Sequence, residues 1–335
     1  MNNKYPNIFD YATKELSQDA FFTWLINWAS PEYNGNPLHD CAVEFINELL
    51  PENINVTIES IETFNQWEHT DIWVSINEKI AIVIEDKINA AEHNNQLEDY
   101  EYTAREWCKD HNYECYFVFL KTGVVKQQER EYLEQEHEKW KIVDCNTVLN
   151  LFNKYREKTD NNIFLDYVNK RNSIENASNS FLNNPIEKWD YAAVEGFFYE
   201  LDNKIDEWHG WGYVNNPSGG FLGLWWHFIK CKDKPFEYYL QLQGLELFIR
   251  INATMLEESD RKSARDEAIR ILDNNLSIAE KHYIDKPKRL ACGKYMAIKH
   301  IDQNAWLIKN SDGIVDIDKT VAKLKEFTYI LDRCM

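Results

Sequence analysis

Three charged residues could together hold a divalent metal ion and stabilise an attacking water: Asp71, Glu85 and Lys87. They lie at the ends of two runs rich in Ile and Val, 71–76 and 80–87, a pattern that predicts a β-hairpin with a three-residue loop. In that register Asp71 lies directly opposite Glu85. Lys87 follows Glu85 by two residues and therefore projects from the same face of its strand. The sequence thus predicts two carboxylates and one ammonium group at one end of the hairpin.

The two faces of this hairpin differ because side chains alternate along a strand. One face is apolar: Ile72, Val74, Ile76, Ile80, Ile82, Ile84 and Ile88. The other carries Asp71, Trp73, Ala81, Val83, Glu85 and Lys87. Opposed carboxylates destabilise a strand pair, and removal of water raises that cost. A divalent metal removes the conflict, because Mg²⁺ (or Mn²⁺) is bound by one or two carboxylates and completes its shell with water and phosphate oxygens.

These residues carry a family resemblance. Asp71 with Glu85-Asp86-Lys87 resembles the D…(D/E)-X-K signature of the PD-(D/E)XK nuclease superfamily. The segment 96–100, QLEDY, is similar to the QxxxY motif of its bacterial recombination-nuclease branch. Upstream, 15–26 (ELSQDAFFTWLI) resembles the first-helix motif of one uncharacterised bacterial group within it. Thr70 stands where the superfamily usually has a proline before the first catalytic Asp.

The resemblance covers about residues 1–170. It implies a Mg²⁺- or Mn²⁺-dependent nuclease in which Asp71, Glu85 and the backbone carbonyl of Asp86 bind the metal. Lys87 would orient or activate the attacking water, and Glu15 on the first helix would reach toward the metal. DNA is the favoured substrate, in a setting such as host defence against phage or DNA processing.

Three more polar residues are candidates on the expected helices. Asp19 shares a helical face with Glu15 and is a weaker second candidate for the metal site. Gln96 could hold the substrate backbone or a metal-bound water, and Tyr100 beside it is a candidate substrate contact. The alternative is that these residues belong to solvated surfaces of amphipathic helices.

The length of the chain allows two domains. We expect an α/β fold: a restriction-endonuclease-like αβββαβ core at 1–170, a Ser- and Asn-rich linker at 171–185, and a smaller α+β domain at 186–335 for substrate selection or assembly. In the first domain, periodicity predicts helices at 8–29, 38–49, 94–110, 127–139 and 146–158, and strands at 54–66, 70–88 (the hairpin), 114–121 and 140–144. In the second it predicts helices at 186–208, 258–274 and 316–333, and strands at 211–216, 221–231, 236–251, 293–301 and 304–309.

The charge distribution bears on the choice of partner. The net charge is −19, and residues 1–100 hold 4 Lys/Arg against 18 Asp/Glu. Such acidity argues against a generic nucleic-acid binder, whose affinity rests on neutralising phosphates. It leaves open a surface kept acidic for solubility, a non-catalytic acidic DNA mimic, or a degenerate nuclease fold retained as a binding protein.

One segment has the opposite charge. Residues 281–300 contain six Lys/Arg and two His against one Asp. Lys286, Lys288 and Arg289 within it are candidate phosphate contacts, and an exposed loop is the alternative.

Cysteine spacing and the distribution of apolar residues indicate the general class of protein. The seven cysteines are odd in number and include no C-x-x-C, so we expect reduced thiols and neither a disulfide framework nor a zinc site. We find no signal-peptide pattern and no apolar stretch near 18 residues, so we expect a soluble, cytoplasmic protein without a membrane partner. The expected partner is nucleic acid, and homo-oligomerisation stays open.

Overall fold

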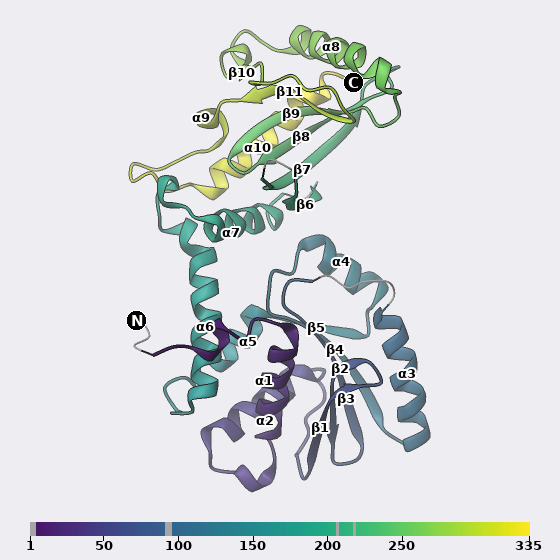
Figure 1. The fold of residues 1–335 in the computed structure, drawn as a ribbon, viewed down its shortest axis with the longest axis vertical. Helices are drawn as coiled ribbons and strands as arrows, with labels where there is room; N and C mark the ends of the chain where they lie inside the picture. The colour runs from purple at the N-terminus through teal and green to yellow at the C-terminus, as the bar shows by residue number, and fades with distance from the viewer. Residues whose placement is uncertain (1–4, 91–95, 206–207, 217–218) are drawn as a thin grey trace. The chain divides into compact units, whose positions relative to one another are not determined.

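The computed structural model describes residues 5–90, 96–205, 208–216 and 219–335 (Figure 1). The chain divides into two compact units, Met1–Glu175 and Asn176–Met335, each built around its own sheet. All seven cysteines are free thiols. Within the described residues, no helix has both the length and the apolar character needed to cross a membrane.

The first unit has a five-stranded mixed sheet in the order β1-β2-β3-β4-β5. Its first three strands, β1 (Ile61–Trp67), β2 (Thr70–Ile76) and β3 (Ile80–Lys87), pair antiparallel. The strands β4 (Glu114–Lys121) and β5 (Trp140–Asp144) continue the sheet in parallel. Together with its helices, this sheet confirms the expected αβββαβ core.

The hairpin of β2 and β3 has the predicted register, with Ile76 opposite Ile80 and Ile72 opposite Ile84. Its loop needs two residues in the left-handed region, and Asn77 and Glu78 adopt φ values of 54° and 52°. Asparagine tolerates this conformation well. The Asn77 side chain also accepts backbone hydrogen bonds from the segment that precedes β1, which fixes the loop against the rest of the unit.

Helices cover both faces of this sheet (Figure 1). One layer contains α1 (Glu15–Asn27), α2 (Pro37–Leu49), α5 (Cys145–Phe152) and α6 (Asn162–Ser178). It buries the Ile-rich face of the hairpin in the larger core, which includes Ile82 and Ile84. The other layer contains α3 (Gln96–His111) and α4 (Gln127–Glu136), which pack on Trp73 and Val83. The predicted difference between the hairpin faces therefore separates two distinct cores.

Three predictions for this unit were wrong in detail, and one helix was not predicted. The helix expected at 146–158 is α5 and ends at Phe152. The predicted strand 54–66 is a strand only from Ile61, because the apolar residues before it pack on the core without strand pairing. The predicted helix 8–29 is a short 3₁₀ turn, Ile8–Asp10, followed by α1. The helix α6 was not predicted, and its buried residues fall at helical spacing among polar ones: Phe164, Tyr167, Val168 and Arg171.

The boundary between the units falls within α6, which continues to Ser178 and is followed by a 3₁₀ turn at Asn179–Leu182. Much of the segment expected as a linker, 171–185, is thus helical. Ser and Asn usually favour loops, but here tertiary burial on the first core stabilises the helix that carries them.

The second unit has a six-stranded antiparallel sheet in the order β10-β11-β9-β8-β7-β6. Its elements are α7 (Tyr191–Asp202), β6 (Trp208–Val214), β7 (Phe221–Lys230), β8 (Glu237–Gln243), β9 (Glu246–Asn252), α8 (Glu258–Asn275), β10 (Ile284–Asp285), β11 (Tyr295–Ile301), α9 (Gln303–Trp306) and α10 (Ile317–Asp332). The unit is therefore the smaller α+β domain that we expected.

The helix expected at 186–208 is shorter, Tyr191–Asp202, and two predictions of element type for this unit were wrong. The single strand expected at 236–251 is a hairpin, because the chain turns at Gly244, whose φ of +56° suits glycine. The strand expected at 304–309 begins as the helix α9, since the side chain of Asp302 accepts from the Asn304 N–H and caps it. Both errors come from local turn and capping chemistry within apolar sequence.

Gly123 offers a test of how tightly the end of β3 is held. A Cβ at this position would lie 1.9 Å from the carbonyl oxygen of Ile88, the residue that follows β3. Because that atom is backbone, Gly123→Ala must displace the chain, and we expect a loss of about 1–3 kcal/mol in the free energy of unfolding. Urea titration measures it.

The matched control is Gly293→Ala, where no atom lies within 4 Å of the added Cβ. Equal unfolding midpoints for the two variants would show that the two segments are not packed as described.

Candidate active site

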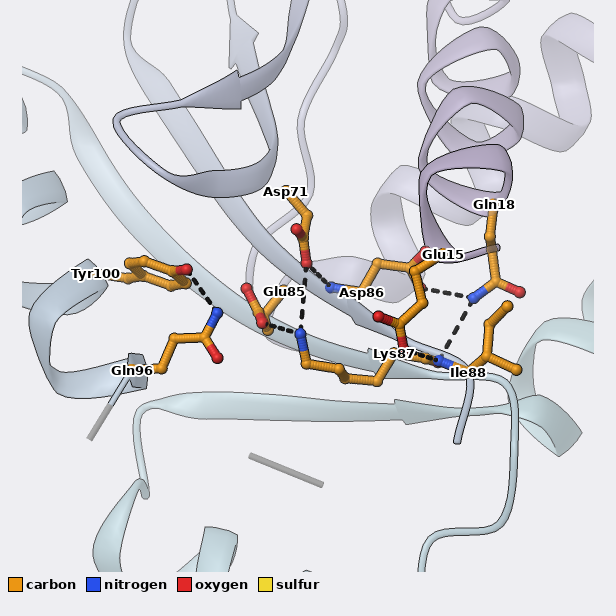
Figure 2. Close-up of polar contacts among 9 residues, drawn as sticks. All are labelled: Glu15, Gln18, Asp71, Glu85, Asp86, Lys87, Ile88, Gln96 and Tyr100. Atoms are coloured by element: carbon orange, nitrogen blue, oxygen red, sulfur yellow. Dashed lines mark hydrogen bonds and ion pairs between the residues drawn. The ribbon is translucent and has the colours of Figure 1, made fainter. Parts of the chain in front are cut away.

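The three charged residues of the hairpin meet at one end of the first sheet (Figure 2). The Nζ of Lys87 donates a hydrogen bond to Oε1 of Glu85 and lies 3.9 Å from Oδ2 of Asp71. The same Asp71 oxygen accepts from the Asp86 backbone N–H at 2.8 Å. The hairpin register thus brings together the residues selected from the sequence.

Burial determines the electrostatics of this group. The Glu85 side chain is 1% exposed, that of Lys87 10% and that of Asp71 23%. Burial, and next the Asp71 carboxylate, raise the pKa of Glu85 to about 8. Burial alone would lower the pKa of Lys87, but the attraction of Glu85 and Asp71 outweighs it and the pKa is raised. The Lys87 ammonium group therefore stays charged. Its positive charge does not fully offset the burial of Glu85 and the nearby negative charge of Asp71.

One acceptor in the site has no donor among the described residues. Oε2 of Glu85 is buried and makes no hydrogen bond within that part of the chain, although Oε1 accepts from Lys87. A buried carboxylate oxygen is normally hydrogen-bonded or bound to a cation. Among the described residues, no group of three or more His, Cys, Asp or Glu side chains is arranged to hold a metal ion. Asp71 and Glu85 nevertheless fit a Mg²⁺-type ion, which needs only one or two carboxylates.

Glu15, at the start of α1, also reaches this end of the sheet. Its Oε1 accepts from the backbone N–H of Ile88 at 3.1 Å. The carboxylate therefore holds the chain immediately after Lys87, beside the charged residues of the hairpin in Figure 2.

The Asp86 side chain lies on the opposite face from Glu85 and Lys87, as strand alternation requires. Its Oδ1 accepts from Nε2 of Gln18 at 2.8 Å. Asp19, the weaker candidate, is also buried there. Burial raises the pKa of Asp19 to about 6, and burial together with the neighbouring Asp19 raises that of Asp86 well above its usual range. This acid pair is therefore separate from the surface that presents Asp71 and Glu85.

Sequence reasoning missed the residue that supports this arrangement, Gln18. Its amide donates to Asp86 and, at 3.5 Å, to the carbonyl of Lys87. Its own oxygen accepts from the hydroxyl groups of Thr122 at 2.6 Å and Tyr167 at 3.1 Å. Gln18 stands three residues after Glu15, so helical spacing could have identified it. Thr122 and Tyr167 carry no local signal, because only the fold brings them near.

Gln96 and Tyr100 lie on the first turns of α3, and Gln96 Nε2 donates to the Tyr100 hydroxyl at 2.5 Å. Figure 2 places the pair on the far side of Glu85 from Glu15. Burial raises the pKa of Tyr100, and the nearby charges of Glu85 and Asp71 raise it further. The other candidates, Lys286, Lys288 and Arg289, are exposed residues of the second unit between β10 and β11.

The raised pKa of Glu85 predicts how stability depends on pH in EDTA. A carboxyl group whose pKa rises on folding stabilises the folded state below its ordinary pKa, and this stabilisation is lost as pH rises through the folded value. We expect the free energy of unfolding of the wild type, relative to Glu85→Gln, to fall between about pH 5 and pH 9. Asp19 and Asp86 titrate in both proteins and cancel from the difference. A difference that stays constant with pH would mean that Glu85 is ionised throughout.

Comparison with known proteins agrees with this geometry. The family model of the PD-(D/E)XK nuclease superfamily matches residues 6–183, more than half of the 335-residue chain. Neither a curated protein nor a solved structure gave a significant match. The matched segment contains every strand of the mixed sheet and all the residues of the site in Figure 2. The chain belongs to the PD-(D/E)XK nuclease superfamily.

Proposed function

We propose that this protein is a divalent-metal-dependent nuclease that hydrolyses phosphodiester bonds of nucleic acid, with DNA as the substrate. One observation carries the proposal: Glu85, buried beside Asp71 and Lys87, has one carboxylate oxygen for which the described residues supply no donor. Such a site is costly to fold unless a cation occupies it. The superfamily to which the chain belongs is one of nucleases, which links this charge arrangement to phosphodiester hydrolysis.

Asp71 and Glu85 would hold Mg²⁺ or Mn²⁺. The Asp86 side chain is engaged with Gln18, so Asp86 would contribute its backbone carbonyl. When bound, the ion stabilises charge that develops on the phosphate and lowers the pKa of water. Lys87, held by Glu85 and close to Asp71, would donate to the attacking water and orient it.

Two further pairs of contacts support the reaction in this proposal. Glu15 holds the Ile88 backbone and so keeps the end of β3 in place. Gln96 and Tyr100, hydrogen-bonded to each other, would contact the substrate backbone beside Glu85. We propose host defence or DNA processing as the setting.

A non-catalytic DNA mimic fits the site less well. A mimic presents carboxylates on its surface, whereas Glu85 is almost fully buried and paired with a lysine. A degenerate fold kept for binding would have no need to retain all three costly charges at the end of the hairpin.

The central test is cleavage by purified protein of single- and double-stranded DNA and RNA, with and without Mn²⁺. We expect Asp71→Ala, Glu85→Ala and Lys87→Ala each to reduce cleavage by roughly a hundredfold or more, as loss of transition-state charge stabilisation does. Gln96→Ala should have a smaller effect. Lys79→Ala is the matched control, because Lys79 is exposed at the opposite end of the same hairpin. Full activity of Glu85→Ala would contradict the assignment of Glu85 to the catalytic site.

Metal binding makes a second prediction that needs no substrate. An ion that binds only the folded site raises stability, by about 2.7 kcal/mol at one hundred times its dissociation constant. The melting temperature of the wild type should therefore rise with Mg²⁺ or Mn²⁺ concentration. Asp71→Asn removes a ligand and one of the opposed charges, so we expect its apo form to melt at or above the apo wild type and its metal-dependent gain to nearly vanish.

NaCl at matched ionic strength controls for screening of the acidic surface. An equal metal-dependent shift in the wild type and in Asp71→Asn would contradict the metal site.

A further inference from the structure

One face of the second unit's sheet is buried beneath helices. The ring of Trp211 on β6 lies 6.1 Å from that of Phe198 on α7, and the Tyr238 hydroxyl on β8 donates to the carbonyl of Ala268 on α8 at 2.8 Å. In Figure 1, α10 crosses behind the strands. The side chains of this covered face are almost entirely buried: Leu224, Trp226, Tyr238, Leu240, Leu242, Leu247, Ile249, Ile251 and Met296.

The opposite face, which we call the aromatic face, is defined by Phe221, Trp225, Phe228, Tyr239, Phe248, Arg250 and Tyr295. Strand register arranges much of it in rows. Trp225 pairs with Gln241, which pairs with Phe248, and Phe248 pairs with His300. In the next row Tyr239 pairs with Arg250. Neighbouring rows lie about 7 Å apart, two residues along each strand.

Several rings on the aromatic face remain accessible to solvent. Tyr295 is 54% exposed, and Trp225 and Phe248 are partly exposed. The ring of Phe228 stacks on that of Tyr239 at 4.5 Å and an interplanar angle of 3°. Within the described residues of the second unit, no helix packs on this face (Figure 1). Tyr239 itself is buried, but three part-exposed rings are unusual for a sheet face that contacts only water, where polar residues normally alternate with the core.

A glycine on β7 contributes to the aromatic face. A Cβ on Gly223 would lie 3.1 Å from the ring of Trp225 and 3.2 Å from that of Phe221. The bare backbone therefore leaves room for two neighbouring rings to approach each other across it.

The segment 286–294, which links β10 to Tyr295 on the aromatic face, is basic; Arg265 on α8 donates to its Leu290 and Ala291 carbonyls. Lys286, Lys288, Arg289 and Lys294 are exposed, and within the described residues their side chains make no ion pair. The segment leads directly into Tyr295, and the Lys294 carbonyl accepts from the Ala253 N–H at 2.7 Å, which ties it to the end of β9.

The acids on the same face are few and lie near its ends. Glu237 accepts from the Asn252 side chain, Asp285 accepts from the Lys286 backbone N–H, and Glu246 stands at the hairpin of β8 and β9. The four exposed cations of the segment, Lys286, Lys288, Arg289 and Lys294, therefore outnumber these three acids.

We propose that the aromatic face binds a single-stranded segment of nucleic acid. Unpaired bases stack on aromatic rings irrespective of sequence, while cations bordering the platform neutralise the phosphates. Trp225, Phe248 and Tyr295 would stack the bases, and Lys286, Lys288 and Arg289 would contact the backbone. A duplex offers no exposed base faces to such a surface. This inference rests on the proposed function, since it supplies that nuclease with a preference for substrates containing unpaired strands.

The test measures binding without cleavage. Full-length Lys87→Ala protein in EDTA is titrated with a fluorescein-labelled 20-mer of thymidylate and with a labelled mixed-sequence duplex of the same length, and binding is followed by fluorescence anisotropy. We expect Phe248→Leu and Tyr295→Leu each to weaken binding of the single strand by roughly tenfold, the usual loss per stacked base, and to leave duplex binding unchanged. Tyr295→Phe, which keeps the ring, should bind like the parent.

Two further variants separate stacking from charge. Tyr329→Leu removes an exposed aromatic ring from α10, outside the aromatic face, and should have no effect. Replacing Lys286, Lys288 and Arg289 with Ser should weaken binding and reduce its dependence on salt, whereas the aromatic variants should leave the salt slope unchanged.

The outcomes distinguish this inference from the proposed function. Unchanged single-strand binding in Phe248→Leu and Tyr295→Leu would overturn it, even if the wild type cleaves DNA. If light scattering also shows that these variants dissociate a dimer, the aromatic face joins two copies of the chain instead. Selective loss of single-strand binding would support the inference even if the wild type proves to have no nuclease activity.

Discussion

The ion pair between Lys87 and Glu85, enclosed at the end of β3, is the interaction on which the first unit depends. Removing two charges from water is unfavourable, and their mutual attraction offsets this cost only when the geometry is good and the remaining lone pairs are satisfied. Here Lys87 satisfies one oxygen of Glu85, and Asp71 adds a second negative charge nearby. The surrounding structure must therefore hold in place a group of charges that would separate in water.

The scaffold around β3 meets this requirement on both of its faces. Ile82 and Ile84 belong to one hydrophobic core and Ala81 and Val83 to the other, so the strand has little freedom to move. After Ile84, the last apolar residue of β3, hydrogen bonds hold the strand in place. Glu15 holds the Ile88 N–H, while Gln18 holds both the Asp86 side chain and the Lys87 carbonyl. A constellation built on a strand and supported by such contacts keeps its geometry better than one on a loop.

The second unit shows a different use of a sheet. Its covered face packs against helices in the ordinary way, whereas its other face carries several rings that stay accessible, Trp225, Phe248 and Tyr295. Apolar surface that folding leaves exposed stays available for binding energy. The acid excess of the first hundred residues and the unpaired cations at 286–294 thus belong to different units. The net charge of −19 is the sum over both units, so it does not describe the charge of either unit.

The amino-acid sequence alone determined the hairpin, its register and the charged group at its end. Strand alternation and a three-residue loop leave one arrangement that buries the Ile-rich face, and a slip of one residue would turn that face to water. The resemblance to the nuclease superfamily selected Glu15, Gln96 and Tyr100 as candidates. Only the tertiary structure decided that α6 is a helix and that Thr122 and Tyr167 converge on Gln18. The physical reason is range: alternation, capping and loop length act over a few residues, whereas these contacts join segments up to 149 residues apart, and their energy exists only once the core has formed.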